Sequence, residues 1–168
     1  ISACSAVNDA SFSAAPAYEP SFVGSLEGAD ITVSGLVPTQ PGAIVAGTFT
    51  GTLSPVGGLS LTATGPGVDG FVVSFAGAAA PIGRKGGGMS VERAAPGRNG
   101  TLVLAGQHQV AVPAFDLGAP VGRTDGFVVT LDTALTPLHA ASFGTPGLST
   151  NTLALAGDAR VGSDELSQ

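Results

Sequence analysis

Few side chains in this sequence could do chemistry. It has one cysteine and two histidines, His108 and His139. Neither histidine has a cysteine, a histidine or a carboxylate beside it at the spacing of a metal site. We therefore predict no metal and interpret both histidines as surface or edge-strand residues. Serine and aspartate are present, but their spacing does not indicate a Ser-His-Asp triad, and no Gly-x-Ser-x-Gly turn occurs.

One glycine-rich stretch formally matches a nucleotide-binding pattern. Residues 65–70 read GPGVDG, which fits Gly-x-Gly-x-x-Gly. The stretch precedes an apolar strand pattern instead of opening a helix, so it offers no helix N-terminus to a pyrophosphate. Asp164 and Glu165 lie together in a polar tail that we expect to be solvated. The sequence therefore predicts no cofactor and no catalytic residue, and the chain is expected not to be an enzyme.

Cys4 is the single cysteine, so the sequence permits no internal disulfide. It ends the sequence Ile-Ser-Ala-Cys, which has an aliphatic residue, two small residues and then a cysteine. This order resembles the bacterial lipobox, in which the cysteine carries a lipid after signal cleavage. Cys4 is therefore a candidate for lipidation, and an ordinary buried or free thiol is the alternative.

Charge and composition exclude several classes of protein. Six basic against twelve acidic residues give a net charge of −6, which would repel a nucleic acid backbone. The arginines are scattered, and we interpret them as solvated. No apolar run reaches the roughly 20 residues of a membrane helix. With 43% hydrophobic but 11% charged residues, and with 26 glycines and 12 prolines, the chain should form strands and turns instead of long helices.

An internal repeat indicates how these strands are organised. Val68–Phe75 reads VDGFVVSF and Thr124–Leu131 reads TDGFVVTL, and their aspartates are 56 positions apart. About 20 residues before each motif stands a second matching pair, AIVAGTF at Ala43–Phe49 and LVLAGQH at Leu102–His108. Repeats of this length, with strands in one order, are typical of stacked units such as propeller blades.

The apolar runs are short, rich in Val, Ile, Phe and Thr, and bounded by turn residues, which predicts strands. Pro41-Gly42 and Asn99-Gly100 are expected turns, because Asn-Gly supplies the positive φ of a tight hairpin. The stretch from Ala76 to Gly88 is too short and too rich in small residues for a normal fourth strand, so the first unit should be incomplete. The predicted strands are Ile31–Leu36, Ala43–Phe49 and Phe71–Phe75 in the first unit, and Met89–Arg93, Thr101–Gln107, Phe127–Leu131 and Leu138–Phe143 in the second.

The sequence thus predicts an all-β fold of repeated four-stranded antiparallel blades, a partial β-propeller or a fragment of one. We expect the phenylalanines of the repeated motif to pack between blades. Its aspartates should hydrogen-bond the turn before their strand, and ligand binding is the alternative. The Ala-Gly pairs at residues 46–47 and 105–106 would suit an inner strand. The structural repeat positions are Asp69, Gly70 and Phe71 in the first copy, and Asp125, Gly126 and Phe127 in the second.

The run AGTFTGTLSPVGGLSLTATGPGVDGFVVSF at Ala46–Phe75 resembles the repeat of secreted bacterial propeller proteins, the SBBP repeat family. The second copy, at Leu102–Asp132, returns to the same motif after a different middle. Two flanking stretches, Ser21–Leu36 and Ser142–Gly157, also parallel each other, so the resemblance covers roughly residues 21–157. It implies a β-propeller, an extracellular or cell-surface location, and generally no assigned catalytic residues.

We expect residues 21–157 to form propeller-type repeats, between an N-terminal segment at 1–20 and a polar tail at 158–168. Propellers close with about 4 to 8 blades, so we expect a fragment of a longer chain or a ring completed by partner chains. The predicted function is a non-catalytic structural or protein-interaction module of the bacterial surface or extracellular space. A lectin-like, ligand-binding propeller is the alternative, and a lipid on Cys4 would anchor either one.

Overall fold

A computed structural model describes residues 26–27, 30–39, 42–55, 57–64, 67–76 and 79–149. This part of the chain consists of β-strands, their connections and two 3-10 turns, η1 at Arg98–Gly100 and η2 at Pro113–Phe115. No helix within it is long and apolar enough to cross a membrane. The strands are β1 (Leu26–Glu27), β2 (Asp30–Thr39), β3 (Gly42–Thr50), β4 (Thr52–Pro55), β5 (Leu61–Thr62), β6 (Asp69–Phe75), β7 (Ile82–Gly87), β8 (Met89–Pro96), β9 (Leu102–His108), β10 (Asp125–Leu131) and β11 (Pro137–Phe143).

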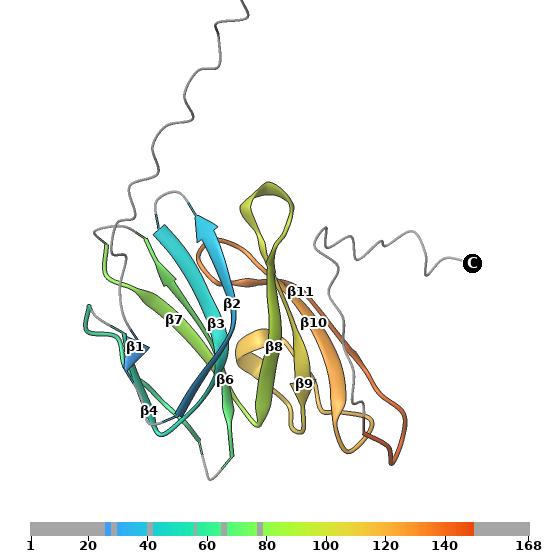
Figure 1. The fold of residues 1–168 in the computed structure, drawn as a ribbon. Helices are drawn as coiled ribbons and strands as arrows, with labels where there is room; N and C mark the ends of the chain where they lie inside the picture. Colours follow the sequence, from blue (N-terminus) through green and yellow to red (C-terminus); the bar gives the residue numbers. More distant parts are fainter. Residues whose placement is uncertain are drawn as a thin grey trace, which may run out of the picture.

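The strands form three antiparallel sheets (Figure 1). Sheet I has the order β2-β3-β6-β7 and sheet II the order β8-β9-β10-β11, while β1, β4 and β5 make a small third sheet. The small sheet lies at the left of Figure 1, sheet I next to it, and sheet II at the right. The fold is therefore all-β with four-stranded antiparallel sheets, as the sequence predicts. The described residues contain no closed barrel or propeller.

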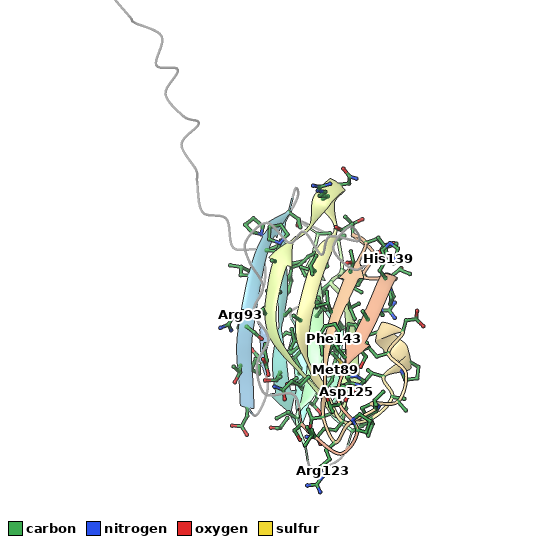
Figure 2. The ribbon with its side chains drawn as sticks, turned by 90° about the vertical axis from the view of Figure 1, so that its right-hand side faces the viewer. Met89, Arg93, Arg123, Asp125, His139 and Phe143 are labelled. Atoms are coloured by element: carbon green, nitrogen blue, oxygen red, sulfur yellow. The ribbon has the colours of Figure 1, made fainter. Side chains whose placement is uncertain are left out.

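Sheets I and II have matching registers. Gly47 lies opposite Phe71 in sheet I, and Gly106 lies opposite Phe127 in sheet II. Both Asp-Gly-Phe-Val-Val segments therefore occupy the third strand of a sheet at the same position, which confirms the prediction that they are equivalent. Figure 2 shows the strands of sheet II from the side, after a turn of 90°.

The fourth strand of sheet I corrects one expectation. The stretch from Ala76 to Gly88 was expected to lack a normal fourth strand, but β7 pairs with β6 along Asp69–Ser74. The glycines of β7 are needed because other segments of the chain pack closely against this strand. A Cβ added to Gly83 would lie 2.5 Å from Leu59, and one added to Gly86 would lie 2.3 Å from Val112. Glycine normally weakens a strand, but here it lets neighbouring segments cover the sheet.

The predicted Asn99-Gly100 turn is present between β8 and β9. Asn99 has φ 55° and Gly100 has φ 77°. Both values fall in the left-handed region that Asn and Gly tolerate and that a tight hairpin requires. The turn thus joins the first two strands of sheet II as expected.

Each large sheet has two faces, because side chains alternate along a strand. We call the face that carries Phe71 in sheet I and Phe127 in sheet II the Phe face, and the opposite face, with Ala46 and Ala105, the Ala face. The Ala face of sheet I packs on the Phe face of sheet II, so the sheets stack head to tail. The buried core residues at this contact are Val37, Ile44, Ala46 and Val72 from sheet I, and Met89, Val91, Leu102, Leu104, Phe127, Val129 and Leu131 from sheet II.

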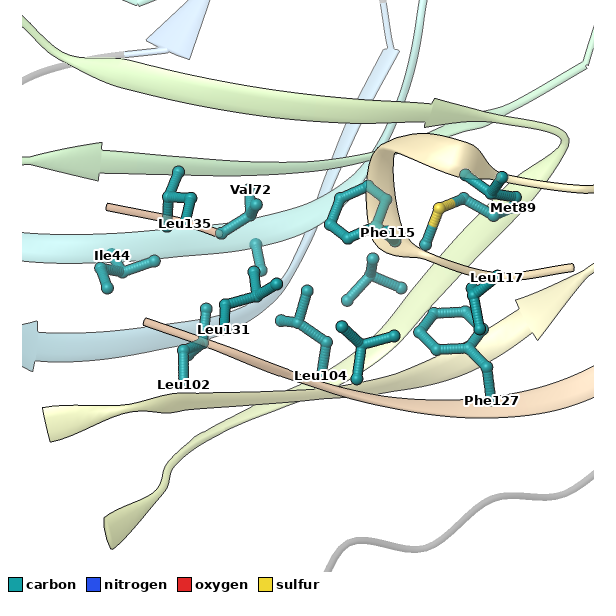
Figure 3. Close-up of a cluster of buried hydrophobic side chains, with 14 of the residues drawn as sticks. Ile44, Val72, Met89, Leu102, Leu104, Phe115, Leu117, Phe127, Leu131 and Leu135 are labelled. Carbon is teal, nitrogen blue, oxygen red and sulfur yellow. The ribbon is translucent and has the colours of Figure 1, made fainter. Parts of the chain in front are cut away.

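The connection between β9 and β10 completes this core. Phe115 of η2 is fully buried, and Val112 and Leu117 beside it are 2% and 3% exposed (Figure 3). Arg84 of β7 donates a hydrogen bond from Nη1 to the Ala114 carbonyl at 2.5 Å. Arg84 therefore links sheet I to this connection, in contrast to the expectation that the arginines are solvated.

The Phe face of sheet I is covered by the small sheet, which the sequence did not predict. Leu53 of β4 and Leu61 of β5 are buried against Phe71 and its neighbours. Phe71 and Phe49 pack edge to face, with ring centroids 5.9 Å apart. Phe127 therefore packs between the large sheets, as expected for both phenylalanines, whereas Phe71 packs beneath the small sheet.

A β-bulge in the first strand of each large sheet explains the Ala-Gly pairs. A Cβ added to Gly47 would lie 1.9 Å from the Thr32 carbonyl oxygen, and one added to Gly106 would lie 1.9 Å from that of Ser90. A bulge disrupts the ladder locally and bends its own strand. The glycines lie in the second strands, β3 and β9, so the crowding comes from the bulged neighbour. The register shifts fall between Val33 and Gly35 and between Val91 and Arg93.

Candidate functional site

Two buried carboxylates begin the third strands of the large sheets. Asp69 starts β6 and Asp125 starts β10, and these residues are 0% and 1% exposed. Phe49 of β3 lies opposite Asp69, and His108 of β9 lies opposite Asp125. A buried carboxylate is costly unless it is hydrogen-bonded or paired. Its partners therefore decide what each site can do.

Asp125 is held by the turn that precedes its strand. The backbone N–H of Val121 donates to Oδ2 at 2.7 Å, and that of Gly122 donates to Oδ1 at 2.8 Å. Burial raises the pKa of the Asp125 carboxyl. The hydrogen bonds from Val121, Gly122 and Ser142, with the charge interaction of His108, outweigh it and hold the pKa below its ordinary value. These interactions therefore favour the ionised form of the Asp125 carboxyl.

Asp69 has a different set of partners at the equivalent position. Oδ2 accepts from Thr64 through its backbone N–H at 2.8 Å and its hydroxyl at 2.9 Å, and Lys85 Nζ lies 3.2 Å away. Oδ1 is buried and has no donor among the described groups. Pro66 lies three residues before Asp69, and Gly122 has the same position relative to Asp125. Proline lacks the N–H that Gly122 donates, so the sequence removes one possible partner of Oδ1.

A serine, a histidine and an aspartate meet at one end of sheet II. His108 Nε2 lies 2.7 Å from Ser142 Oγ, and His108 Nδ1 lies 2.9 Å from the Val110 carbonyl oxygen. Because a carbonyl only accepts, His108 Nδ1–H donates to Val110. Ser142 has one hydroxyl proton, so it donates either to His108 Nε2 or to the Asp125 carboxylate. Ser142 Oγ is also 3.4 Å from Asp125 Oδ2. The three side chains therefore join β9, β10 and β11.

The order of these contacts differs from that of a catalytic triad. In a triad the aspartate bonds the histidine nitrogen that faces away from the serine. Here the Val110 carbonyl occupies that nitrogen, and Asp125 contacts Ser142 directly. An ionised carboxylate beside Ser142 Oγ would oppose negative charge developing at the serine or on an attacked substrate. The arrangement satisfies the hydrogen-bonding groups of the buried His108 and Asp125 side chains.

The sequence pattern did not predict the contacts among His108, Ser142 and Asp125. Spacing gave no triad signal because His108 and Ser142 are brought to Asp125 by strand pairing. His108 is fully buried in a central strand, so its assignment to the surface or an edge is wrong, whereas His139 lies exposed on the edge strand β11. One signal was available: His108 takes the place of Phe49 in the aligned copies. The rings of His108 and Phe127 indeed pack edge to face at 6.2 Å, as Phe49 and Phe71 do.

Comparison with known proteins adds no function to these residues. No family model matches the chain, and no curated protein does. The roles of Asp69 and Asp125 are therefore argued from their contacts alone. Both carboxylates fix the entry of a third strand, one through an ion pair and one through backbone amides.

An open cavity of about 470 Å³ lies beside Asp69. Thr64 and Lys85, the partners of Asp69, form its polar wall, and Val112 and Ala114 of the β9–β10 connection form an apolar wall. Gly86 and Gly87 of β7 also line it, so no side chain of these two residues fills the space. The cavity could take a small neutral ligand, because the charge of Lys85 is already paired with Asp69.

The remaining sequence candidates fall into two groups. Cys4, the lipidation candidate, lies outside the described residues. In the GPGVDG stretch, Asp69 and Gly70 begin β6, a strand and not a helix, as expected. Within the described ranges, no group of three or more His, Cys, Asp or Glu side chains could hold a metal ion.

Proposed function

We propose that the chain is a non-catalytic, propeller-type module of the bacterial surface or extracellular space that works through contacts with other protein units. The head-to-tail stacking of sheets I and II carries this proposal. In such a stack one face of each unit receives the opposite face of the next, so units can be added without a new kind of contact. Further units would come from the same protein or from partner chains.

The surface that would receive the next unit repeats an existing one. On the Ala face of sheet I, the residues that receive sheet II include Ile44, Ala46 and Val72. The matching registers place three apolar residues at the equivalent positions on the Ala face of sheet II, and these are Val103, Ala105 and Val128. Val103 and Ala105 are already only 4% and 0% exposed, so a third sheet would have to displace the groups that cover them, whereas Val128 is half-buried.

The contacts among Asp125, His108 and Ser142 support a non-catalytic function. Asp125 bonds Ser142 instead of His108, and the histidine is fully buried. The lipobox-like sequence that ends at Cys4 and the resemblance to secreted propeller repeats support the proposed location.

An extended chain tests the stacking directly. We would insert a second copy of residues 88–149 after Ser149 and measure urea unfolding. If the copy stacks, the free energy of unfolding should rise and one transition should remain, because each new interface adds stability. Val128→Lys in the original unit should remove this gain, since it places a charge in the new contact.

Two controls make the result specific. Val128→Lys in the unextended chain should cost less than about 1 kcal/mol, because Val128 is only half-buried there. Val121→Lys, at an exposed position in the loop before β10, should leave the gain intact. An inserted copy that melts separately, with the parent midpoint unchanged, would contradict the proposal.

A ligand-binding module is the second candidate, and the cavity beside Asp69 favours it. Lys85 and Thr64 line the cavity, and their ammonium and hydroxyl groups could bind a hydroxyl-rich ligand such as a sugar. A glycan-array screen tests this candidate, with Ala111→Trp, at an exposed position of the cavity lining, as the variant that narrows the cavity. Binding that survives Ala111→Trp, or no binding at all, would argue against this site.

A further inference from the structure

The tip of the β8–β9 hairpin carries the one Asn-Gly pair of the sequence, Asn99-Gly100. Both residues are exposed, and the Asn99 side chain has no hydrogen bond within the described part of the chain. A Cβ added to Gly100 would have only the Thr133 methyl group near it, at 3.9 Å. The tip extends beyond the ends of the neighbouring strands in Figure 1. The side-chain amide of Asn99 is therefore accessible and makes no contact that would hold it.

An asparagine followed by glycine can lose its side-chain amide without an enzyme. The backbone nitrogen of the glycine attacks the side-chain carbonyl carbon, and a five-membered succinimide ring forms. The amide nitrogen leaves as ammonia and takes the proton of the attacking nitrogen. Water then opens one of the two ring carbonyls, which leaves aspartate or isoaspartate in the chain. Glycine favours the attack because it has no Cβ beside the reacting nitrogen.

The closed turn holds the reacting atoms of Asn99 and Gly100 apart. Asn99 has φ 55° and ψ 33°. Around the Cα–C bond, Cβ is offset from the backbone nitrogen by about 120°, so at this ψ the Gly100 nitrogen lies nearly opposite the Asn99 side chain. Ring closure needs that nitrogen on the same side as Cβ, which requires a large rotation of ψ out of the left-handed region. The turn therefore blocks the attack as long as it stays closed.

Few contacts keep the turn closed. The Arg98 carbonyl accepts from the Thr101 N–H at 3.1 Å and from the Thr101 hydroxyl at 2.8 Å. Gly97 N–H donates to the Thr101 carbonyl at 2.7 Å. Residues 97–101 are exposed or half-buried, and the core begins only at Leu102, which is 1% exposed. The tip can therefore open without exposing the core, and such local opening costs less free energy than global unfolding.

We propose that Asn99 is a site of spontaneous deamidation whose rate is set by opening of the β8–β9 turn. Only the open form reacts, so the folded chain converts slowly and the amount of product records how often the turn opens. Isoaspartate adds one atom to the backbone of a two-residue turn, which no longer matches the geometry of a tight hairpin. Each reaction also adds one negative charge to a chain of net charge −6. The modified chain is thus permanently altered at one end of sheet II.

Peptide mapping by mass spectrometry during incubation at neutral pH tests the proposal. The full chain is incubated both folded and in urea, and aspartate and isoaspartate at position 99 are measured over time. Conversion should be at least about tenfold slower in the folded chain, because only the open fraction of the turn reacts. Asn99→Gly keeps a residue that tolerates positive φ and should form no acid at this position.

Thr101→Val provides the matched variant. It removes the hydroxyl that bonds the Arg98 carbonyl and keeps the shape of the side chain. The folded chain should then deamidate at least about threefold faster, because the lost hydrogen bond favours the open turn. The rate in urea should stay the same, since neither reacting residue is changed. Thr62→Val removes an exposed hydroxyl of the small sheet and should leave both rates unaltered.

Amide exchange at position 101 measures the opening independently, because this N–H closes the turn onto the Arg98 carbonyl. Exchange and deamidation should accelerate together in Thr101→Val. Three results would overturn the proposal: no acid at Asn99 in urea, equal rates in the folded and unfolded chain, or faster exchange in Thr101→Val without faster deamidation. The stacking of further units does not enter these measurements, so either proposal can fail alone.

Discussion

At the scale of single residues, the two repeated phenylalanines are both fully buried, but they pack against different neighbours. Phe127 is fully buried between sheets I and II, in contact with the ring of His108. Phe127→Ala should lower the free energy of unfolding by about 3–5 kcal/mol, because it removes a large buried side chain and leaves a cavity. Urea unfolding measures the loss. Leu148→Ala, at an exposed position, should cost below about 1 kcal/mol, and an equal effect of both changes would show that Phe127 is not core.

The carboxylate of Asp125 should make stability depend on pH. Its folded-state pKa lies below the unfolded value, so the ionised group adds stability that is fully present above the unfolded pKa of about 4. That stability is lost as the pH falls through the folded-state pKa. Asp125→Asn should therefore flatten the acid side of the stability curve. Unfolding midpoints measured from about pH 2 to 6 check this, with the exposed Asp116→Asn as control, and an unaltered curve for Asp125→Asn would refute it.

At the scale of elements, the bulged strands decide where side chains are allowed. Gly106 faces the bulge of β8, where an added Cβ would lie 1.9 Å from the Ser90 carbonyl. Gly106→Ala should destabilise the protein by about 2 kcal/mol or more, because backbone atoms must move to admit a methyl group. Thermal or urea unfolding measures this. Gly118→Ala has open space around the new methyl group and should be nearly neutral. A neutral Gly106→Ala would mean that the bulge is not formed.

At the scale of the whole molecule, sheets I and II should unfold as one unit, because a single core joins them. Leu104 of sheet II is fully buried in the core that Val72 of sheet I shares. Leu104→Ala should lower the stability of both sheets by the same amount, about 2–5 kcal/mol. Native-state amide exchange of β3 and β9 measures each sheet separately. Protection of β3 that is unchanged by Leu104→Ala would show two independent units.

Much of this fold could be predicted from the sequence, because strand patterns and turn chemistry are local. The Asn99-Gly100 turn needs two positive φ values, which these residues tolerate, and the Asp-Gly-Phe-Val-Val segments begin short apolar runs rich in Val and Phe, as buried strands do. The repeat also gave the matching register of the two sheets. β7 was not predicted because its sequence is rich in glycine, which is a poor strand former. Its glycines are required by segments that approach from elsewhere in the chain.

The sequence by itself determined most strands of the two large sheets, their order along the chain and the equivalence of Asp69 and Asp125. The tertiary structure alone decided the partners of these carboxylates, because hydrogen bonds depend on atoms brought together by strand pairing and loop closure. Ser142 and His108 are 34 positions apart, yet their side chains meet at 2.7 Å. The tertiary structure also decided why the Ala-Gly pairs need glycine. A side chain at these positions would clash with a carbonyl oxygen on the neighbouring strand, and no local sequence pattern encodes that contact.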